Sequence, residues 1–345
     1  MGVKHSDHPK YSLIVATYNR LDEMIELTQS MRQLEFDRSA FELVVVDDGS
    51  SDGTKDFMHA VDLPFEIQYH FQQNQGPGAA RNKAMQYAKG EYFIFIDSDV
   101  ILPANYLAEI DRSVKAHHWD AFGGPDDCHP DFPPLLKAIN YSMTSFLGTG
   151  GTRGSEKSVT KFYPRSFNMG IHRRVFDAIG GMNDLRHGQD MDFSARIYEA
   201  GYKVGLIKDA VVFHKRRTSL RKFYKQIFNW GIARINLGRM YPEMLKAVHL
   251  LPAALVATVV LVLLLSIIVP SIRPILWLLL LGAVSIATLA WAQSFSQYRS
   301  RKVAGLSIIT LFIQVFAYGF GTWSGLYQWM LGKKRAEGFT RDYYK

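Results

Sequence analysis

Three long stretches without a charged side chain occupy the last third of the sequence: 247–272, 274–298 and 303–332. Each exceeds the ~20 residues that an α-helix needs to cross the hydrocarbon core of a membrane. Only the sequence PSIRP separates the apolar cores of the first two stretches, so we expect them to form a tight helical hairpin. Because two such runs follow each other directly, they indicate membrane helices rather than helices of a protein core.

The net charge of +8 is located in the same part of the chain. Residues 246–345 carry 10 basic and 2 acidic side chains, whereas residues 1–245 carry 30 of each. A nucleic-acid-binding protein would carry its basic excess on the folded domain that meets phosphate. The charge therefore indicates membrane lipids as a partner and argues against nucleic acid.

Two further features concern the compartment of residues 1–245. The N-terminal sequence MGVKHSDHPKYS lacks the apolar core of a secretory signal, so we expect this part of the chain to stay in the cytosol. The single cysteine, Cys128, excludes an internal disulfide and a structural zinc site built on cysteine, and it fits a reducing compartment.

The third apolar stretch leaves two topologies open. The positive-inside rule places the loop with Arg299, Arg301 and Lys302 in the cytosol. If the third stretch crosses the membrane once, the basic residues at 333–335 lie outside, against the same rule. Alternatively, the sequence GFGTWSG (319–325) breaks this stretch into a re-entrant pair.

Residues 1–125 alternate between apolar, β-branched runs and segments with helical spacing. This alternation predicts an α/β fold with a mostly parallel sheet covered on both faces, and ligands at the carboxyl ends of its strands. The predicted strands are 11–17, 41–48, 65–71 and 91–99, and the predicted helices lie over 21–35 and 78–90.

Four polar clusters fall at the ends of these elements: ATYNR (16–20), VVVDDGSSDGT (44–54), NQGPGAARNKA (74–84) and IDSDV (96–100). An Asp-x-Asp at a strand end brings two carboxylates to one site, and Mg²⁺ or Mn²⁺ is held by such carboxylates together with the phosphates of a nucleotide. GPGAAR matches a dinucleotide glycine fingerprint only weakly, because the third glycine is missing.

The order and spacing of the four clusters resemble those of the family 2 glycosyltransferases, which have the GT-A nucleotide-sugar-binding fold. The resemblance continues through FNMGIHRRVFDAIGGMND (167–184), which is similar to the acceptor-side segment of the family. It also includes GQDMDFSARIYEAGYKV (188–204), which is similar to the Glu-Asp catalytic motif of the family.

The resemblance implies a role for residues in each cluster. Asp99 would be the main ligand of a divalent cation, Mg²⁺ or Mn²⁺, with Asp97 beside it, and Asp190 would be the general base. His214 would supply a further metal or pyrophosphate contact, although a lone histidine at a strand end also fits a purely structural role. The nucleotide-sugar-binding residues would be Thr17, Tyr18, Arg20, Asp48, Arg81, Asp97 and Ser98.

The chain departs from the family motif at Gln189, where a glutamate is common. Gln189 cannot ionise, so any acidic role at this position is lost, whereas Asp190 is retained. Asp192 is a second nearby carboxylate. Residues two apart on a helix point in nearly opposite directions, so we expect Asp192 to be a helix cap or a salt-bridge partner.

The segment between Asp209 and Glu243 contains no acid but many basic residues, with apolar residues at helical spacing among them. This pattern predicts a basic amphipathic helix in the headgroup layer of the membrane, and an ordinary surface helix is the alternative. The predicted organisation is a glycosyltransferase domain over 1–213, this interfacial region over 214–246, a membrane domain over 247–332 with apolar segments at about 250–269, 274–293 and 305–331, and a basic tail over 333–345.

These features together predict an integral protein of a bacterial inner membrane with a cytosolic catalytic domain. The expected reaction is inverting transfer of a single sugar from a UDP- or GDP-linked donor to a lipid-linked acceptor, such as a polyprenyl phosphate, in polysaccharide or glycolipid biosynthesis. One alternative is a processive polysaccharide synthase, although the Gln-x-x-Arg-Trp signature is absent and QIFNW (226–230) is only distantly similar. The other is a non-catalytic membrane assembly subunit with a degenerate transferase domain.

Overall fold

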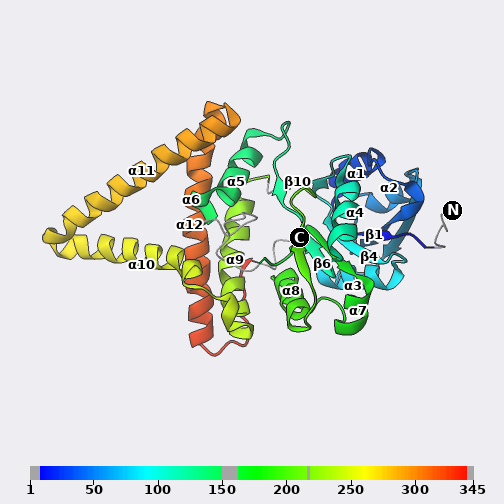
Figure 1. Cartoon of the computed structure of the whole chain (residues 1–345). Coiled ribbons are helices and arrows are strands. Elements are labelled where there is room, and N and C mark those ends of the chain that lie inside the picture. Colours follow the sequence, from blue (N-terminus) through cyan, green and yellow to red (C-terminus); the bar gives the residue numbers. More distant parts are fainter. Residues whose placement is uncertain (1–7, 150–161, 186, 216–217, 340–345) are drawn as a thin grey trace. The chain divides into compact units, whose positions relative to one another are not determined.

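The computed structural model of the protein describes residues 8–149, 162–185, 187–215 and 218–339 (Figure 1). The chain forms two compact units, and each is described by itself. The first contains Met1–His129 and Lys161–Lys215, and the second contains Pro130–Thr160 and Arg216–Lys345.

The first unit is built on a seven-stranded sheet with the strand order β3-β2-β1-β4-β8-β6-β9. The neighbours among β1 to β4 pair in parallel, and β8 runs antiparallel to both β4 and β6. The predicted α/β fold with a mostly parallel sheet is therefore confirmed. The strands are β1 Tyr11–Thr17, β2 Phe41–Asp47, β3 Glu66–Phe71, β4 Tyr92–Asp97, β6 Ala121–Gly123, β8 Asn168–His172 and β9 Val204–Leu206.

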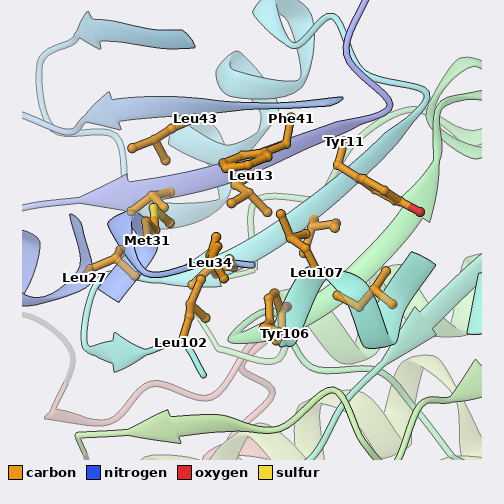
Figure 2. Close-up of a cluster of buried hydrophobic side chains, with 14 of the residues drawn as sticks. Tyr11, Leu13, Leu27, Met31, Leu34, Phe41, Leu43, Leu102, Tyr106 and Leu107 are labelled. Atoms are coloured by element: carbon orange, nitrogen blue, oxygen red, sulfur yellow. The ribbon is translucent and has the colours of Figure 1, made fainter. Parts of the chain in front are cut away.

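Helices cover both faces of this sheet because successive strand residues point to opposite sides. Leu13 and Leu43 join one core with Met31 and Leu107 (Figure 2). Ile14 points the other way and joins a second core. The first core is covered by α1 Leu21–Arg32 and α4 Tyr106–His117, the second by α3 Pro77–Tyr87, α7 Arg173–Ile179 and α8 Gln189–Glu199; α2 Thr54–Ala60 and the 3₁₀ turn η1 Arg38–Ala40 complete this unit.

The register of the sheet brings the polar clusters to one edge. Thr17 at the end of β1 pairs with Asp47 on β2, and Ala16 pairs with Asp97 on β4. A second sheet has three strands in the order β5-β10-β7. Its first strand, β5, begins shortly after Asp97 in the sequence. Its strands are β5 Val100–Ile101, β7 Asp126–Asp127 and β10 Val212–His214.

The second unit is helical. Three of its helical segments, Ala247–Ile268, Pro270–Tyr298 and Arg301–Met330, are long and apolar enough to cross a membrane. The first two form a hairpin with the PSIRP sequence at its tip, but its arms diverge from that tip, so it is not the tight hairpin that the sequence predicted (Figure 1). The elements are α5 Pro134–Thr144, α6 Phe146–Thr149, α9 Leu220–Met240, η2 Pro242–Met244, α10 Ala247–Ile268, η3 Pro270–Ile272, α11 Arg273–Tyr298 and α12 Arg301–Met330.

The third apolar stretch forms one continuous helix, α12, so the break that a re-entrant pair requires is not there. The glycines of GFGTWSG serve close helix packing instead. A Cβ atom at Gly321 would clash with the carbonyl oxygen of Phe228 on α9, and one at Gly231 would clash with the carbonyl oxygen of Tyr318 on α12. Small residues at such positions let two helix backbones approach closely.

Residues 130–149 are grouped with the C-terminal helices, whereas the sequence placed them inside a 1–213 domain. Helix α5 carries polar groups that bond to the apolar helices: Ser142 Oγ donates to Thr310 Oγ1 at 2.6 Å, and the hydroxyl of Tyr141 donates to Gln293 Oε1 at 2.8 Å. The apolar face of α9 is likewise buried within this unit, with Phe223 and Ile227 fully covered.

Candidate active site

Two carboxylates and one imidazole form a cluster at the carboxyl end of β4. Asp97 is the last residue of β4, and Asp99 follows in the turn that leads to β5. His214 is the last residue of β10. Each of the three residues offers one ligand atom, and these atoms lie within 4.8 Å of one another. The sequence predicted both carboxylates as ligands and left the histidine open, and the structure brings all three together.

Strand pairing explains how His214 reaches the Asp-x-Asp turn. β10 pairs antiparallel with the short strand β5, and His214 lies opposite Val100. The backbone N–H of Lys215 continues this pairing by donating to the carbonyl oxygen of Asp99 at 2.7 Å. As a result, Nε2 of His214 lies 3.1 Å from Oδ1 of Asp99.

A further carboxylate lies on the other side of the same imidazole. β7 pairs in parallel with β10, and Oδ2 of Asp126 lies 3.5 Å from Nδ1 of His214. Burial alone would lower the pKa of His214. The negative charges of Asp99 and Asp126, on either side of the imidazole, outweigh that effect and raise the pKa of His214 to about 9.

The donor set of this cluster suits Mn²⁺ or Mg²⁺. Two carboxylate oxygens and one imidazole nitrogen are ligands that Mn²⁺ accepts, and both ions also bind through the phosphates of a nucleotide. The residues that would hold the ion are Asp97, Asp99 and His214, with Asp126 fixing the orientation of the imidazole.

Two arginines add positive charge beside the carboxylates. Arg81 on α3 is almost fully buried, and its Nη2 donates to Oδ1 of Asp97 at 2.6 Å. Burial acts to lower the pKa of Arg20, but the pKa is raised overall because Asp99 and Glu23 favour the charged guanidinium. Both guanidinium groups lie next to the position predicted for the nucleotide.

Asp48 joins the end of β2 to the loop before α3. Its carboxylate accepts hydrogen bonds from the backbone N–H groups of Gln75 and Gly76, at 2.9 and 2.8 Å, and from Nε2 of Gln72 at 2.7 Å. The sequence assigned Asp48 to the nucleotide base. The structure adds a second task, which is to fix the loop that leads into α3.

The loop after β1 carries the remaining predicted nucleotide contacts. Thr17 is buried at the end of β1, and Tyr18 is half-buried beside it. Asn19 adopts a positive φ of 49°, and its Oδ1 accepts from the backbone N–H of Ser51 at 2.8 Å. This bond ties the loop to the one after β2. Ser98, between the two metal-binding carboxylates, is buried.

Asp190 lies in the first turn of α8, where a negative charge is favourably placed. It is half-buried, and its Oδ1 accepts from the backbone N–H of Met191 at 2.9 Å. Gln189 before it donates from Nε2 to the carbonyl oxygen of Asn183 at 3.1 Å. The residue that replaces the family glutamate therefore supports the loop that enters α8.

Asp192 is a salt-bridge partner, as the sequence predicted. Only 2% of this residue is exposed, and its Oδ2 lies 3.1 Å from Nε of Arg196 one turn later. The same guanidinium donates to the carbonyl oxygens of Ile179 and Gly181. Asp192 thus positions the guanidinium of Arg196, which in turn binds the backbone of the turn between α7 and α8.

Helix α3 contacts both Asp97 and the segment that leads to Asp190. Arg81 reaches Asp97 as described, and the next residue, Asn82, points to the other side. The side-chain amide of Asn82 bonds to both the N–H and the carbonyl of Met182, each at 2.7 Å. At the start of α3, a Cβ atom on Gly78 would clash with the amide of Gln189.

Two residues that shape the site were not predicted from the sequence. The carboxylate of Asp126 lies beside Nδ1 of His214, and Asn168 holds the chain next to both residues. Nδ2 of Asn168 donates to the carbonyl oxygen of Ala210 at 2.7 Å and to that of Pro125 at 3.3 Å. Asn168 stood within the FNMG segment that the resemblance covers, so a signal existed for it. The two-residue strand of Asp126 is too short to give one.

With this geometry established, comparison with known proteins identifies the family. Residues 12–180 match the family model described as Glycosyl transferase family 2, and residues 154–294 match the one described as Glycosyl transferase family group 2. The two matches together span most of the chain. The protein belongs to the family 2 glycosyltransferases and has the GT-A fold, as the sequence motifs indicated.

Two relatives illustrate the range of the family. The chain is 28% identical to the putative glycosyltransferase EpsH of Bacillus subtilis over 254 residues, which is 65% of this chain and 67% of EpsH. It is 34% identical over 217 residues to TarS of Staphylococcus aureus, a poly(ribitol-phosphate) beta-N-acetylglucosaminyltransferase. That match covers 59% of this chain and 35% of TarS, so the chain spans about a third of that relative.

A solved structure shows the same fold over nearly the whole chain. The mannosyltransferase PcManGT from Pyrobaculum calidifontis, in complex with GDP-Man and Mn²⁺, covers 94% of this chain and 88% of its own, with a TM-score of 0.56 and 17% sequence identity. At this identity the likeness establishes the fold and leaves the substrates of the two proteins to be compared by experiment.

Proposed function

We propose that the protein is a membrane-anchored, metal-dependent inverting glycosyltransferase that moves one sugar from a nucleoside diphosphate sugar to a lipid-linked acceptor. The observation that carries this proposal is the convergence of Asp97, Asp99 and His214 at the carboxyl end of β4. Ligands of open α/β sheets bind at that edge. The arginines beside the cluster suit the phosphates of a nucleotide.

The expected donor is a UDP- or GDP-linked sugar. PcManGT was solved with GDP-Man and Mn²⁺, and TarS is named as an N-acetylglucosaminyltransferase. These relatives support a nucleoside diphosphate sugar as the class of donor and do not choose between the two bases. Thr17, Tyr18, Arg20, Asp48, Arg81 and Ser98 are the residues proposed to bind it, with Asp97 on the ribose and metal side.

The proposed reaction is a single displacement. The acceptor hydroxyl oxygen attacks the anomeric carbon from the face opposite the nucleotide, and the bond from that carbon to the diphosphate oxygen breaks. Asp190 takes the hydroxyl proton, and the nucleoside diphosphate leaves with the bonding electron pair. A divalent cation bound by the Asp-Asp-His group would neutralise the negative charge of the departing diphosphate.

The acceptor is proposed to be attached to a membrane lipid, such as a polyprenyl phosphate glycan. The apolar helices support this proposal, because an enzyme held at the membrane meets a lipid-linked acceptor in two dimensions. We place the protein in a bacterial inner membrane with the catalytic unit on the cytosolic side, in agreement with the basic loop Arg299–Lys302.

The test is donor turnover by the purified full chain in lipid nanodiscs, across a panel of UDP- and GDP-sugars with Mn²⁺ or Mg²⁺. We expect one nucleotide class to be consumed, at a rate that chelation of the metal abolishes. Metal-independent turnover would contradict the proposed role of the Asp-Asp-His group. A product extended by many sugars would show a processive synthase, and nucleotide binding without any turnover on added lipid acceptors would favour the assembly subunit.

A further inference from the structure

The three apolar helices are covered by the protein to very different extents. In the most apolar part of α10, 17% of the residues are buried, and in the second segment, which contains α11, the share is 6%. In α12 it is 44%. Much of the apolar surface of α12 is therefore packed against neighbouring helices. Most of the apolar surface of α10 and α11 is not covered by the protein and is available for contact with lipid.

Hydrogen bonds join the hairpin to α12 near its two open ends. Near the start of α10, the carbonyl oxygen of Ala253 accepts from Nε1 of Trp323 at 2.9 Å. Near the end of α11, the hydroxyl of Ser294 bonds to that of Ser307 at 2.7 Å. Beyond these contacts both helices project away from α12 and converge at their tip (Figure 1). Helix α12 therefore runs from one foot of the hairpin to the other.

This arrangement fixes the direction of α12 relative to any membrane that the hairpin crosses. The two feet of a membrane-spanning hairpin lie on the same side of the bilayer, at a similar level. Ser307 and Trp323 are 16 residues apart on α12, or ~24 Å at the rise of an α-helix. A helix that connects two points at the same level lies along the membrane surface rather than across it.

The packing of α9 also indicates that α12 lies along the membrane surface. The two helices run side by side in the same direction, with Gly231 against Tyr318, Ile235 against Gly325, and the guanidinium of Arg239 over the ring of Trp329. If α12 crossed the bilayer, α9 would cross with it. Polar and basic residues from the middle of α9 would then lie in the hydrocarbon, which is unfavourable. They are Lys225, Asn229, Arg234 and Asn236.

The C-terminal segment is fixed to α9 as well. The side-chain amide of Asn236 bonds to both the N–H and the carbonyl of Ala336, each at 2.9 Å. Arg239 donates to the carbonyl oxygens of Lys333 and Lys334, at 3.0 Å. Basic residues therefore flank both ends of α12, which the positive-inside rule accommodates only if both ends are on one side.

The exposed surface of α12 suits the interfacial layer. Its large exposed apolar side chains include Ile309, Phe320, Trp323 and Tyr327. Their separations of 11, 3 and 4 residues place all four on one face of the helix. Tryptophan and tyrosine favour the boundary between headgroups and hydrocarbon. The face that meets α9, with Gly321 and Gly325, is a different one.

We propose that only α10 and α11 of the three apolar helices cross the membrane, and that α12 lies in the plane of the bilayer surface with its aromatic face toward the lipid and α9 beside it. The residues at 333–335 are then on the same side as Arg299, Arg301 and Lys302. Both topologies that the sequence left open, a single crossing and a re-entrant pair, are replaced by a surface helix.

Cysteine labelling tests the sidedness. In a Cys128→Ser background, Ser271→Cys, Ser300→Cys and Glu337→Cys place one thiol each at the hairpin tip, before α12 and after it; Glu337→Cys leaves the basic residues at 333–335 unchanged. A membrane-impermeant maleimide is added to right-side-out and inside-out vesicles of cells expressing the full chain. We expect Ser271→Cys to react from one side, and Ser300→Cys and Glu337→Cys from the other. Labelling of Glu337→Cys from the same side as Ser271→Cys would overturn the proposal.

Depth measurements test the orientation of α12 independently. Nitroxide labels at Ile309→Cys and Tyr327→Cys lie on the same helix face, 18 residues apart, which is ~27 Å along the axis. In nanodiscs, relaxation by oxygen and by a water-soluble nickel chelate should place both labels at the same depth within a few ångström. A difference in depth approaching the axial separation would show that α12 crosses the bilayer and would refute the surface placement.

Discussion

The imidazole of His214 lies 3.1 Å from the carboxylate of Asp99, although the two residues are far apart in the sequence. Antiparallel pairing of β10 with β5 creates this contact, because it sets His214 opposite the residue that follows Asp99. The histidine thereby completes a candidate metal-binding group whose other members come from a single Asp-x-Asp turn. The position of this imidazole leads us to expect that Mn²⁺ affinity depends on His214, on Asp126 and on pH.

The first prediction is that His214→Ala weakens Mn²⁺ binding at least ~10-fold, because loss of one ligand of three leaves the ion more exposed to water. Binding is measured by the electron paramagnetic resonance signal of free Mn²⁺. The matched control is His172→Ala. His172 also has a carboxylate partner, Glu91 at 3.2 Å, but lies at the opposite end of β8 from the site. Equal losses in both variants would mean that the effect is general destabilisation.

Asp126→Asn should weaken Mn²⁺ binding about 10-fold, because Asp126 orients the imidazole and raises its basicity without touching the ion. Asp127→Asn provides a neighbouring control, since Asp127 is exposed and bonds only locally, to the N–H of Cys128. Titration with Mn²⁺ compares the affinity of the two variants with that of the unmodified protein. Unchanged affinity in Asp126→Asn would remove Asp126 from the site.

Metal binding should become stronger as the pH rises toward 9. The pKa of His214 is raised to about 9, so without metal the imidazole carries a proton at neutral pH. A metal ligand must be deprotonated, so the ion has to displace this proton. Below the pKa, the affinity is expected to rise about tenfold per pH unit. Titrations at several pH values check this slope, and His214→Ala should lose it. If Mn²⁺ affinity still rises tenfold per pH unit in that variant, the proton that the metal displaces belongs to a group other than His214.

Four strands of the first unit, β1 to β4, could be predicted from sequence, because each lies in an apolar run that ends in polar residues, whereas β5 to β10 were not predicted. The run 11–17 coincides with β1, and the acidic residues Asp47 and Asp97 end β2 and β4. The same logic placed Asp97 and Asp99 at the ligand edge of the sheet. Local patterns of this kind depend only on neighbouring residues, so one sequence is enough to find them.

Features that depend on contacts between distant segments were not accessible in this way. The GFGTWSG sequence looked like a possible helix break, because nothing near it shows that Gly321 faces the backbone of Phe228. Asp126 gave no signal, since only pairing with β10 brings it to His214. Residues 130–149 pack with the apolar helices through contacts between segments far apart in the sequence, such as Ile139 with Ala317 and the bond from Ser142 to Thr310.

The close approach of α9 and α12 gives a stability prediction. Gly321→Ala places a methyl group against the backbone of α9, which should cost about 1–3 kcal/mol and lower the thermal unfolding midpoint. Gly305→Ala, on the same helix, is the control. Its added methyl group has no atom within 4 Å and should be neutral or stabilising by up to ~1 kcal/mol. Thermal unfolding in detergent compares the two, and equal midpoints would contradict the packing described.

Asp190 is proposed to be the general base that takes the proton of the acceptor hydroxyl, and the Asp190→Asn variant removes this ability. Asparagine keeps the size and hydrogen bonding of the side chain but cannot accept the acceptor proton. General-base assistance is typically worth about 10²–10⁴-fold in rate. Asp192→Asn is the matched control, because Asp192 lies two residues further along the first turn of the same helix and pairs with Arg196 instead.

The decisive measurement is kcat for sugar transfer by the full chain and both variants, together with metal-dependent binding of the donor. We expect Asp190→Asn to lower kcat by at least ~10²-fold with donor affinity nearly unchanged, and Asp192→Asn to lose far less activity. Full activity in Asp190→Asn, or a larger loss in Asp192→Asn, would contradict it.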